Sequence, residues 1–417
     1  QGSWIGATMT GDDADAYKEA GNFEVGMIPY AFEDGIDTIL TNSPSWWSVY
    51  KDGNVEAAEA FLQWLTTDEA QEVLVKEAGF VSPFKSCTIV GDDPFAQTIT
   101  DYVSAGKTSA WPWILQRADP YVYKHTDGAY YFTASVPEYD RIVLRKSDTL
   151  AGLETADETE IWHKHESGPQ SIHIWAPELH YLFGKWYIYY AGGDKDDIWA
   201  IRPYVLECQG DDPVNDEWIE KGKMQRADED EFSFEAFSLD ATVFEVNNVW
   251  YYIWAEKVGV GKQISNLYIA RMKNGYTLDT VQVLLTTPDY DWERHGFWVN
   301  EGPAVLKRNG KVFVTFSASD TGIHYCVGLL TADESSDLLD PRSWEKDRYP
   351  VLCSDETAGV YGPGHNSFTV DENGDDIMVY HARTETEIVG NPLYNPNRHA
   401  MLMRFGWKDG RPVFSYN

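Results

Sequence analysis

Residues 119–135 read DPYVYKHTDGAYYFTAS: a polar residue, an apolar run, a DG turn and a second apolar run that ends in small residues. The same template returns in ELHYLFGKWYIYYA from Glu178, DATVFEVNNVWYYIWA from Asp240, EGPAVLKRNGKVFVTFSA from Glu301 and HNSFTVDENGDDIMVYHA from His365. A third strand-like run follows each copy, for example RIVLRKS after the first. Units of three or four strands that recur about every 60 residues are typical of propeller blades, so the pattern predicts an all-β, five-bladed β-propeller.

The leading residues of the five units are four acids and a histidine: Asp119, Glu178, Asp240, Glu301 and His365. Equivalent positions of successive blades converge on the axis of a propeller, so we expect these side chains to surround one mouth of the central channel. Carboxyl groups are costly to bury unless they are paired, metal-bound or catalytic. A single acid in this place would be explained equally well by bonds to blade-entry backbone groups, but a ring of acids indicates chemistry.

Hydrolysis of a glycosidic bond needs two carboxyl groups on opposite sides of a sugar. One must be protonated to donate to the leaving oxygen, and the other must be ionised to activate water. Crowded like charges push pKa values apart, so a third acid would help to keep the donor protonated. The predicted ring supplies all three roles.

The charge of the chain narrows the choice of ligand. The 417 residues include 67 acids and 33 bases, a net charge of −34, which repels nucleic acids and anionic membranes and suits a neutral ligand. No apolar run approaches the length of a membrane span. The opening residues QGSWIGATMTGDDADAY have no basic or apolar leader, so we expect a cytoplasmic location, with secretion as the alternative. The oligomeric state is left open.

Residues 1–115 differ from the rest and predict a small, mainly helical α/β segment, with the β-propeller occupying residues 116–417. Strands are expected at residues 23–30 and 45–50, and two helices between residues 55 and 80. Thr66, Thr67 and Asp68 supply an N-cap between the helices, and Gln71 follows Asp68 at the spacing of a capping box.

The motifs ADPYVYKHTDGAYYFTAS, IWAPELHY, SLDATVF, VNEGPAVL and YGPGHNSF resemble glycoside hydrolase family 43 in order and spacing. The resemblance covers about residues 116–417 and implies a five-bladed propeller that inverts anomeric configuration. By motif, Asp119 matches the general base and Glu301 the general acid. Asp240 matches the carboxylate that orients the donor and tunes its pKa.

The same resemblance suggests roles for other residues. His365 matches an axial histidine that contacts a structural calcium ion or its waters, with a simple hydrogen bond between blades as the alternative. Trp175 matches an aromatic wall of the pocket. Arg383 resembles an arginine that reaches the sugar, although a salt bridge to a ring acid would also explain it. Glu178 departs from the more common aspartate, and we interpret it as a residue behind the first layer of contacts.

The residues of these motifs are most similar to those of the α-L-arabinofuranosidase branch of that family, particularly enzymes that release terminal arabinose from α-1,5-linked arabinan or its oligosaccharides. A β-xylosidase on the same fold and a non-catalytic carbohydrate-binding propeller are the alternatives. Residues 1–115 resemble the C-terminal part of an extracellular sugar-binding protein of an ABC importer. Trp46 and Trp47 would supply at most half of such a site, so we expect no contribution to catalysis; an accessory sugar-binding module is the alternative.

Overall fold

The computed structural model describes residues 39–41, 55–77, 82, 89–91, 96–104, 108–110, 112–258 and 264–416. The chain divides into two compact units, residues 1–111 and residues 112–416. The predicted strands at residues 23–30 and 45–50, together with Trp46 and Trp47, lie outside the described residues.

Short helices make up most of the described part of the first unit: α3 (Val55–Leu65), α4 (Asp68–Glu72) with a π-helical turn after it (Val73–Glu77), and α5 (Ala96–Ser104). Strands β1 (Ile39–Thr41) and β2 (Thr108–Ala110) pair in parallel. None of the helices in the described ranges is long and apolar enough to cross a membrane.

The cap of α4 lies one residue earlier than the capping box requires. Thr67 is the N-cap, and its hydroxyl accepts the N–H of Ala70 at 3.4 Å. The amide nitrogen of Gln71 donates to the carbonyl of Leu65 at 2.5 Å instead of returning to the cap. The predicted capping box is therefore wrong, although the predicted helix start is confirmed.

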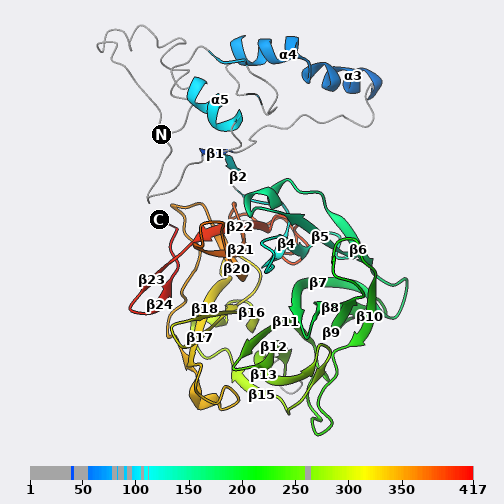
Figure 1. The fold of residues 1–417 in the computed structure, drawn as a ribbon, viewed down its shortest axis with the longest axis vertical. Helices are drawn as coiled ribbons and strands as arrows, with labels where there is room; N and C mark the ends of the chain where they lie inside the picture. The colour runs from blue at the N-terminus through cyan, green and yellow to red at the C-terminus, as the bar shows by residue number, and fades with distance from the viewer. Residues whose placement is uncertain are drawn as a thin grey trace. The chain divides into compact units, whose positions relative to one another are not determined.

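The second unit consists of antiparallel strand groups that follow one another along the chain, and Figure 1 shows them arranged in a ring. We divide them into five groups by the repeats of the sequence, although a short parallel pairing of β13 (Ile264–Asn274) with β16 (Trp298–Arg308) joins the third and fourth groups into one continuous sheet. The first group contains β3 (Ala118–Lys124), β4 (Tyr130–Ser135), β5 (Arg141–Ser147) and β6 (Thr159–His163). The second contains β7 (Pro169–Leu182), β8 (Lys185–Asp194), β9 (Asp197–Cys208) and β10 (Trp218–Lys223). The third contains β11 (Ser238–Val246), β12 (Val249–Lys257) and β13 (Ile264–Asn274), with the short strands β14 (Thr277–Leu278) and β15 (Val283–Thr286) beside β13.

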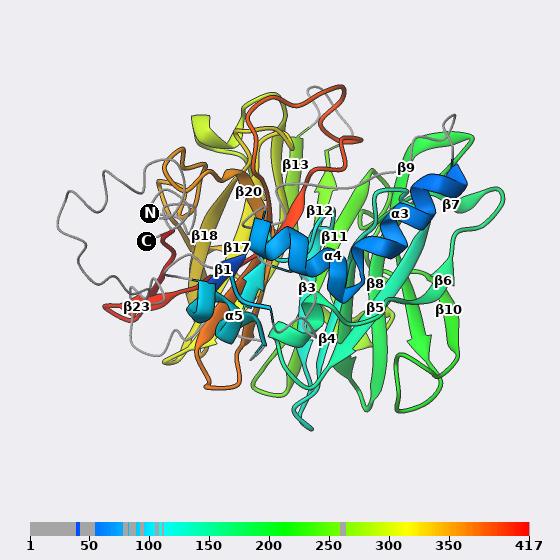
Figure 2. The ribbon, with the colours of Figure 1, turned by 90° about the horizontal axis from the view of Figure 1, so that it is seen from above.

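The fourth group contains β16 (Trp298–Arg308), β17 (Lys311–Ala318), β18 (Cys326–Asp333) and β19 (Glu345–Lys346). The fifth contains β20 (Tyr361–Val370), β21 (Asp376–Arg383) and β22 (His399–Arg404), and the hairpin of β23 (Gly406–Lys408) and β24 (Arg411–Val413) follows it. Figure 2, which is turned by 90° from Figure 1, shows the long strands of this unit running side by side. Aromatic and aliphatic side chains fill the space between the groups, with Trp186 and Trp254 among the largest fully buried ones.

One irregularity recurs in the first strand of every group. In each of these strands the register against the next strand shifts at one shared place by one extra residue, which is a β-bulge, and β7 and β20 have further shifts before it. The residue at which each bulge begins has a positive φ: 53° at Asp119, 46° at Ala176, 51° at Asp240, 53° at Gly302 and 41° at His365. We call these five the bulge residues.

The bulges correct the predicted ring of equivalent residues. Asp119, Asp240 and His365 are bulge residues and occupy equivalent positions. Glu301 comes one residue before the bulge residue of its strand, and Glu178 comes two residues after the bulge residue of its own. Because an extra residue changes which way the following side chains point, spacing along the sequence alone cannot assign the register.

Side chains of one group accept backbone hydrogen bonds from the next group at these bulges. Ser135 ends β4, and its hydroxyl oxygen accepts the N–H of Ala176 at 2.8 Å. The hydroxyl oxygen of Ser317, near the end of β17, accepts the N–H of His365 at 2.6 Å. The small residues that end the second run of the repeat therefore link neighbouring groups.

The fifth group closes on the first in two places. The Nδ1 atom of His381 accepts the N–H of Asp119 at 3.0 Å. Ile114 and Ala400 exchange backbone hydrogen bonds of 3.1 and 2.9 Å, so the segment before β3 extends the sheet of β22. Trp113 and Ile114 are buried in the same hydrophobic cluster as Ala400. The β unit thus begins at residue 112 rather than at the predicted residue 116.

We predict that Ile114→Ala destabilises the β unit by about 2–5 kcal/mol, because it leaves a cavity where the ring closes. The adjacent Leu115 is 46% exposed, so Leu115→Ala is a matched control and should change the free energy of unfolding by less than about 0.5 kcal/mol. Thermal and denaturant unfolding measure both. Equal effects of the two variants would contradict the closing role of Ile114.

Candidate active site

Two bulge aspartates meet around the bulge histidine. The Nδ1 atom of His365 lies 3.4 Å from Oδ1 of Asp119 and 3.7 Å from Oδ2 of Asp240. All three side chains are buried. Burial lowers the pKa of His365, which favours a neutral ring beside the two carboxyl groups. The structure therefore brings together these three predicted residues.

The surroundings of Asp119 stabilise its ionised form. Ser135 donates its hydroxyl to Oδ2 at 2.6 Å, and Nη1 of Arg398 lies 3.4 Å from Oδ1. Burial alone would raise the pKa of Asp119, but attraction to His365 when that ring is protonated, the charge of Arg398 and the contact with His381 hold it well below its usual range. The Nδ1 atom of His381 already accepts the Asp119 N–H, and burial lowers the pKa of His381 to about 4. Arg398 is therefore the permanent cation that keeps this carboxylate ionised.

The surroundings of Glu301 favour its protonated form instead. It is half-buried, and Tyr325 donates its hydroxyl to Oε1 at 2.9 Å. Burial raises the pKa of Glu301 to about 7, and the negative charge of Asp119 adds to the increase, while the Tyr325 hydrogen bond opposes it. A carboxyl group with such a pKa can hold a proton near neutral pH and release it there.

Asp240 also favours its neutral form. Burial raises its pKa well above the usual range, and the charges of Glu301 and Asp119 add to the effect. The N–H of Gly302 donates to Oδ2 of Asp240 at 3.1 Å, which links Asp240 to the strand that carries Glu301. Asp240 and Glu301 therefore titrate as an interacting pair.

Gly302 is required for this packing. Its φ of +53° is unfavourable for other residues, and an added Cβ would lie 3.0 Å from Cγ of His365. The glycine that follows Glu301 thus allows the bulge histidine to approach the strand of the predicted acid.

Glu178 points into a separate hydrogen-bonded chain. Its Oε2 lies 2.7 Å from Nε2 of His180, whose Nδ1 lies 3.2 Å from the hydroxyl of Tyr121. This pairing satisfies a buried carboxyl group behind the Asp119–Asp240 cluster. The arrangement agrees with a supporting position rather than with a fourth reactive acid.

Trp175 lies in an aromatic cluster beside the acids. Its indole stacks on His173, with ring centroids 4.4 Å apart, and meets Tyr139 edge-on at 5.7 Å. The ring is 6% exposed, and its Nε1 donor has no acceptor among the described residues. A buried indole N–H without a partner is suited to a bound hydroxyl group or a water molecule.

Arg383 makes no salt bridge to a ring acid among the described residues. Its guanidinium group donates to Oδ1 of Asn395 at 2.6 Å and to the carbonyl of Pro392 at 2.8 Å, so it holds the loop before β22. Arg398 is the arginine that lies beside Asp119. It comes from a loop without strand periodicity and without a motif in the repeat, so sequence reasoning missed it.

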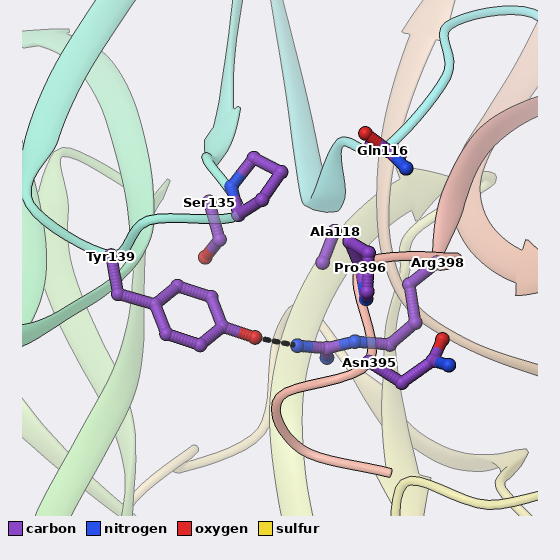
Figure 3. Close-up of a pocket in the computed structure, with 8 residues that line it drawn as sticks. Gln116, Ala118, Ser135, Tyr139, Asn395, Pro396 and Arg398 are labelled. Atoms are coloured by element: carbon purple, nitrogen blue, oxygen red, sulfur yellow. Dashed lines mark hydrogen bonds between the residues drawn. The ribbon is translucent and has the colours of Figure 1, made fainter. Parts of the chain in front are cut away.

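Figure 3 shows Arg398 extending toward Tyr139 in a small pocket that Ser135 also lines. Nη2 of Arg398 donates to the Tyr139 hydroxyl at 2.8 Å, and that hydroxyl donates to the carbonyl of Leu393 at 2.6 Å. Tyr139 therefore fixes both Arg398 and its loop. Sequence reasoning missed Tyr139 as well, because it lies in the connection after β4 rather than in a repeated position.

The described residues contain no group of three or more His, Cys, Asp or Glu side chains arranged to hold a metal ion directly. Next to His365, the side chain of Asn366 is buried without a hydrogen-bond partner in the part of the chain that the structure describes. Asn366 is 1% exposed, and neither atom of its amide group has a hydrogen bond within the described structure.

Comparison with known proteins gives consistent matches to the β unit. The model of the family described as glycosyl hydrolases family 43 matches residues 112–412. An extracellular exo-alpha-(1->5)-L-arabinofuranosidase from Streptomyces avermitilis is 50% identical over 305 residues, which are 73% of this chain and 62% of that protein. A protein of the same name from Streptomyces chartreusis is 51% identical over 282 residues, 67% of this chain and 84% of that protein.

A solved structure agrees with these sequence matches. The crystal structure of alpha-L-arabinofuranosidase from Lactobacillus brevis is 51% identical, with a TM-score of 0.68, and the match covers 73% of this chain and 96% of that one. This chain therefore spans nearly all of one solved relative but less than two thirds of the length of the Streptomyces avermitilis protein.

We predict that Tyr325→Phe raises the pKa of Glu301 above about 7, because the lost hydroxyl donates to the ionised carboxylate and stabilises it. A hydrogen bond to a charged group corresponds to a shift of about one to two pH units. Carbon-13 NMR of protein labelled at glutamate carboxyl groups would follow the titration. Tyr187→Phe, which removes a similar bond to the distant Glu207, is the control and should leave the Glu301 titration unchanged. A titration that stays near 7 or falls in Tyr325→Phe would contradict this assignment.

Proposed function

Because this chain belongs to glycosyl hydrolase family 43, we propose that it is an inverting, exo-acting α-L-arabinofuranosidase that releases terminal arabinose from α-1,5-linked arabinan or arabino-oligosaccharides. The observation that carries the proposal is the division of protonation in one buried cluster: an ionised Asp119 beside a Glu301 whose pKa is near 7. The substrate follows the names of relatives that are about 50% identical over the β unit.

We also propose that the five antiparallel groups are the five blades of a propeller. The five equivalent bulges and the pairing of Ile114 with Ala400 support this interpretation. The bulge residues would then surround one mouth of the central channel.

In the proposed mechanism Asp119 is the general base. Its ionised carboxylate accepts a proton from the attacking water while Ser135 and Arg398 hold its orientation. Glu301 is the general acid and donates its proton to the leaving oxygen. Asp240 titrates together with Glu301 and so tunes the pKa of the donor, while the negative charge of Asp119 helps to keep Glu301 protonated. The Gly302 N–H fixes Asp240 in place.

For substrate binding, we propose that Trp175 walls the pocket and that Arg398 takes the sugar-contacting role that the sequence suggested for Arg383. Arg398 lies beside the base, whereas Arg383 is committed to Asn395 and Pro392. Arg383 would instead position the loop that carries Arg398. Trp175 Nε1 would donate to a sugar hydroxyl.

The relatives favour secretion over the cytoplasmic location expected from the sequence, because both Streptomyces proteins are named extracellular. We therefore propose an extracellular enzyme. An extracellular location also agrees with a polymeric substrate such as arabinan.

A structural calcium ion near His365 remains a proposal. Imidazole is a poor ligand for calcium, which prefers oxygen, so an ion would be held mainly by waters. The unpaired amide oxygen of Asn366 fits such a hydrated ion. When bound, the ion would fix the strands around the bulges and would not act on the substrate.

Substrates with different leaving groups should distinguish the proposed acid, Glu301, from the proposed base, Asp119. Glu301→Gln is expected to lower kcat/KM about 10²–10⁴-fold on arabino-oligosaccharides but much less on a dinitrophenyl arabinofuranoside, whose leaving group needs no proton. Asp119→Asn should lower both by several orders of magnitude. Glu207→Gln, a buried glutamate bonded to Tyr187, is the control and should preserve the wild-type ratio of the two rates.

Equal losses on both substrates in Glu301→Gln would reject Glu301 as the acid. Proton NMR of the first product tests the stereochemistry, and a retained anomer would reject inversion. Faster hydrolysis of β-xylosides than of α-L-arabinofuranosides would favour the β-xylosidase alternative. Binding without turnover would favour a carbohydrate-binding module.

We predict that exhaustive chelation lowers the melting temperature or kcat partially and that added calcium restores it. Asn366→Ala should reduce this dependence on calcium, whereas replacement of the exposed Asn247 by Ala should not. Unchanged stability and activity after chelation would refute the calcium proposal.

A further inference from the structure

The first half of β7 is the most irregular strand segment of the second group. Its register against β8 shifts three times, between Pro169 and Trp175 and again after Trp175. His173 lies inside this stretch with a φ of 55°. Repeated bulges of this kind commonly direct side chains at functional sites. Here they present His173 and Trp175 to the loops at this end of the unit.

His173 joins three aromatic side chains. Its ring stacks on Trp175 and on Tyr394, with centroids 4.4 and 5.9 Å apart and interplanar angles of 26° and 28°. It also contacts Trp199, whose ring is tilted by 32° with its centroid 5.5 Å away. Trp175 and His173 are 6% and 2% exposed, whereas Trp199 is 50% and Tyr394 is 49% exposed. The stack thus runs from the buried wall of the site to two rings that face solvent.

Both nitrogens of His173 are used to fix this arrangement. Nδ1 lies 3.0 Å from the carbonyl of Ile198, which can only accept, so Nδ1 carries the proton. Nε2 then accepts the hydroxyl of Tyr394 at 3.0 Å. Burial lowers the pKa of His173, which keeps the ring neutral in this tautomer. Trp199 and Tyr394 are therefore held in place before any ligand arrives, which reduces the entropy lost on binding.

The stack is continuous with the acid cluster. Trp175 meets Tyr139 edge-on at 5.7 Å, Tyr139 bonds Arg398 at 2.8 Å, and Arg398 lies 3.4 Å from Asp119. The exposed rings are thus the outer end of one series of contacts that begins at the proposed base.

The charge beside Trp199 favours a neutral ligand. Three aspartates, Asp194, Asp196 and Asp197, lie just before it in the turn between β8 and β9. Lys195, the single base in that turn, is bonded to the carbonyl of Glu166. Neutral sugars present apolar faces that stack on aromatic rings, while uronic acids and phosphates would be repelled by the aspartates.

We propose that Trp199 and Tyr394 form a binding platform for the leaving-group side of the substrate, which stacks the neutral sugar next to the residue that is cleaved. This inference rests on the proposed function and deepens it, because it makes the length of the oligosaccharide, and not only its terminal sugar, a determinant of catalytic efficiency.

The test compares α-1,5-linked arabinotriose with methyl α-L-arabinofuranoside, whose leaving group is too small to reach the platform. Trp199→Ala and Tyr394→Ala are each expected to lower kcat/KM for arabinotriose about 3- to 10-fold more than for the methyl glycoside, the size of one aromatic stacking contact. Phe183→Ala is the matched control, because Phe183 is an aromatic residue of 45% exposure at the other end of β7. It should change neither rate constant.

Binding provides a second measurement. In a Glu301→Gln background, calorimetry should find a weaker affinity for arabinotriose when Trp199→Ala is added, with the affinity for free arabinose little changed. Equal losses on the two substrates, no loss on arabinotriose, or the same loss in Phe183→Ala would overturn the platform. A wild-type protein that hydrolyses neither arabinoside would overturn the proposed function instead, so the two failures are distinguishable.

Discussion

The structure of the β unit depends on one constraint: a residue with a left-handed backbone begins a bulge in each strand group, and its N–H must find a partner. Such backbones cost about 1–3 kcal/mol each in residues other than glycine, so they persist only where surrounding contacts enforce them. Ser135, Ser317 and His381 supply acceptors from the preceding group. The bonds that hold neighbouring groups together are therefore the bonds that position Asp119 and His365, and assembly of the ring cannot be separated from assembly of the site.

The second determinant is an uneven distribution of positive charge among three crowded acids. Arg398 lies against Asp119, whereas Asp240 accepts a backbone N–H and Glu301 accepts a tyrosine hydroxyl. Arg398 thus favours the ionised form of Asp119, while burial favours a shared proton on Asp240 and Glu301. Tyr139 holds that cation, so a residue outside the repeats controls the chemistry of residues within them.

Much of this organisation could be predicted from the sequence. The period of the repeats predicted an all-β unit of successive antiparallel strands, and the leading residues of the repeats identified Asp119, Asp240 and His365 as neighbours. The displacement of Glu301 and Glu178 from the bulge positions of their strands could not be predicted, because a bulge changes strand register without changing the spacing of the repeats. Tyr139 and Arg398 were missed because loops carry no periodicity, and their contacts join residues about 260 positions apart.

The pairing of Ile114 with Ala400 also has a consequence for biosynthesis. The first residues of the β unit to leave the ribosome find their partners almost last, after nearly the whole unit has been translated. At about 5–20 residues per second, the nascent chain carries an unpaired Trp113–Ile114 segment for about 15–60 s. During that interval the earlier groups can form locally, but the ring stays open, and the net charge of −34 opposes self-association of the unfinished chains.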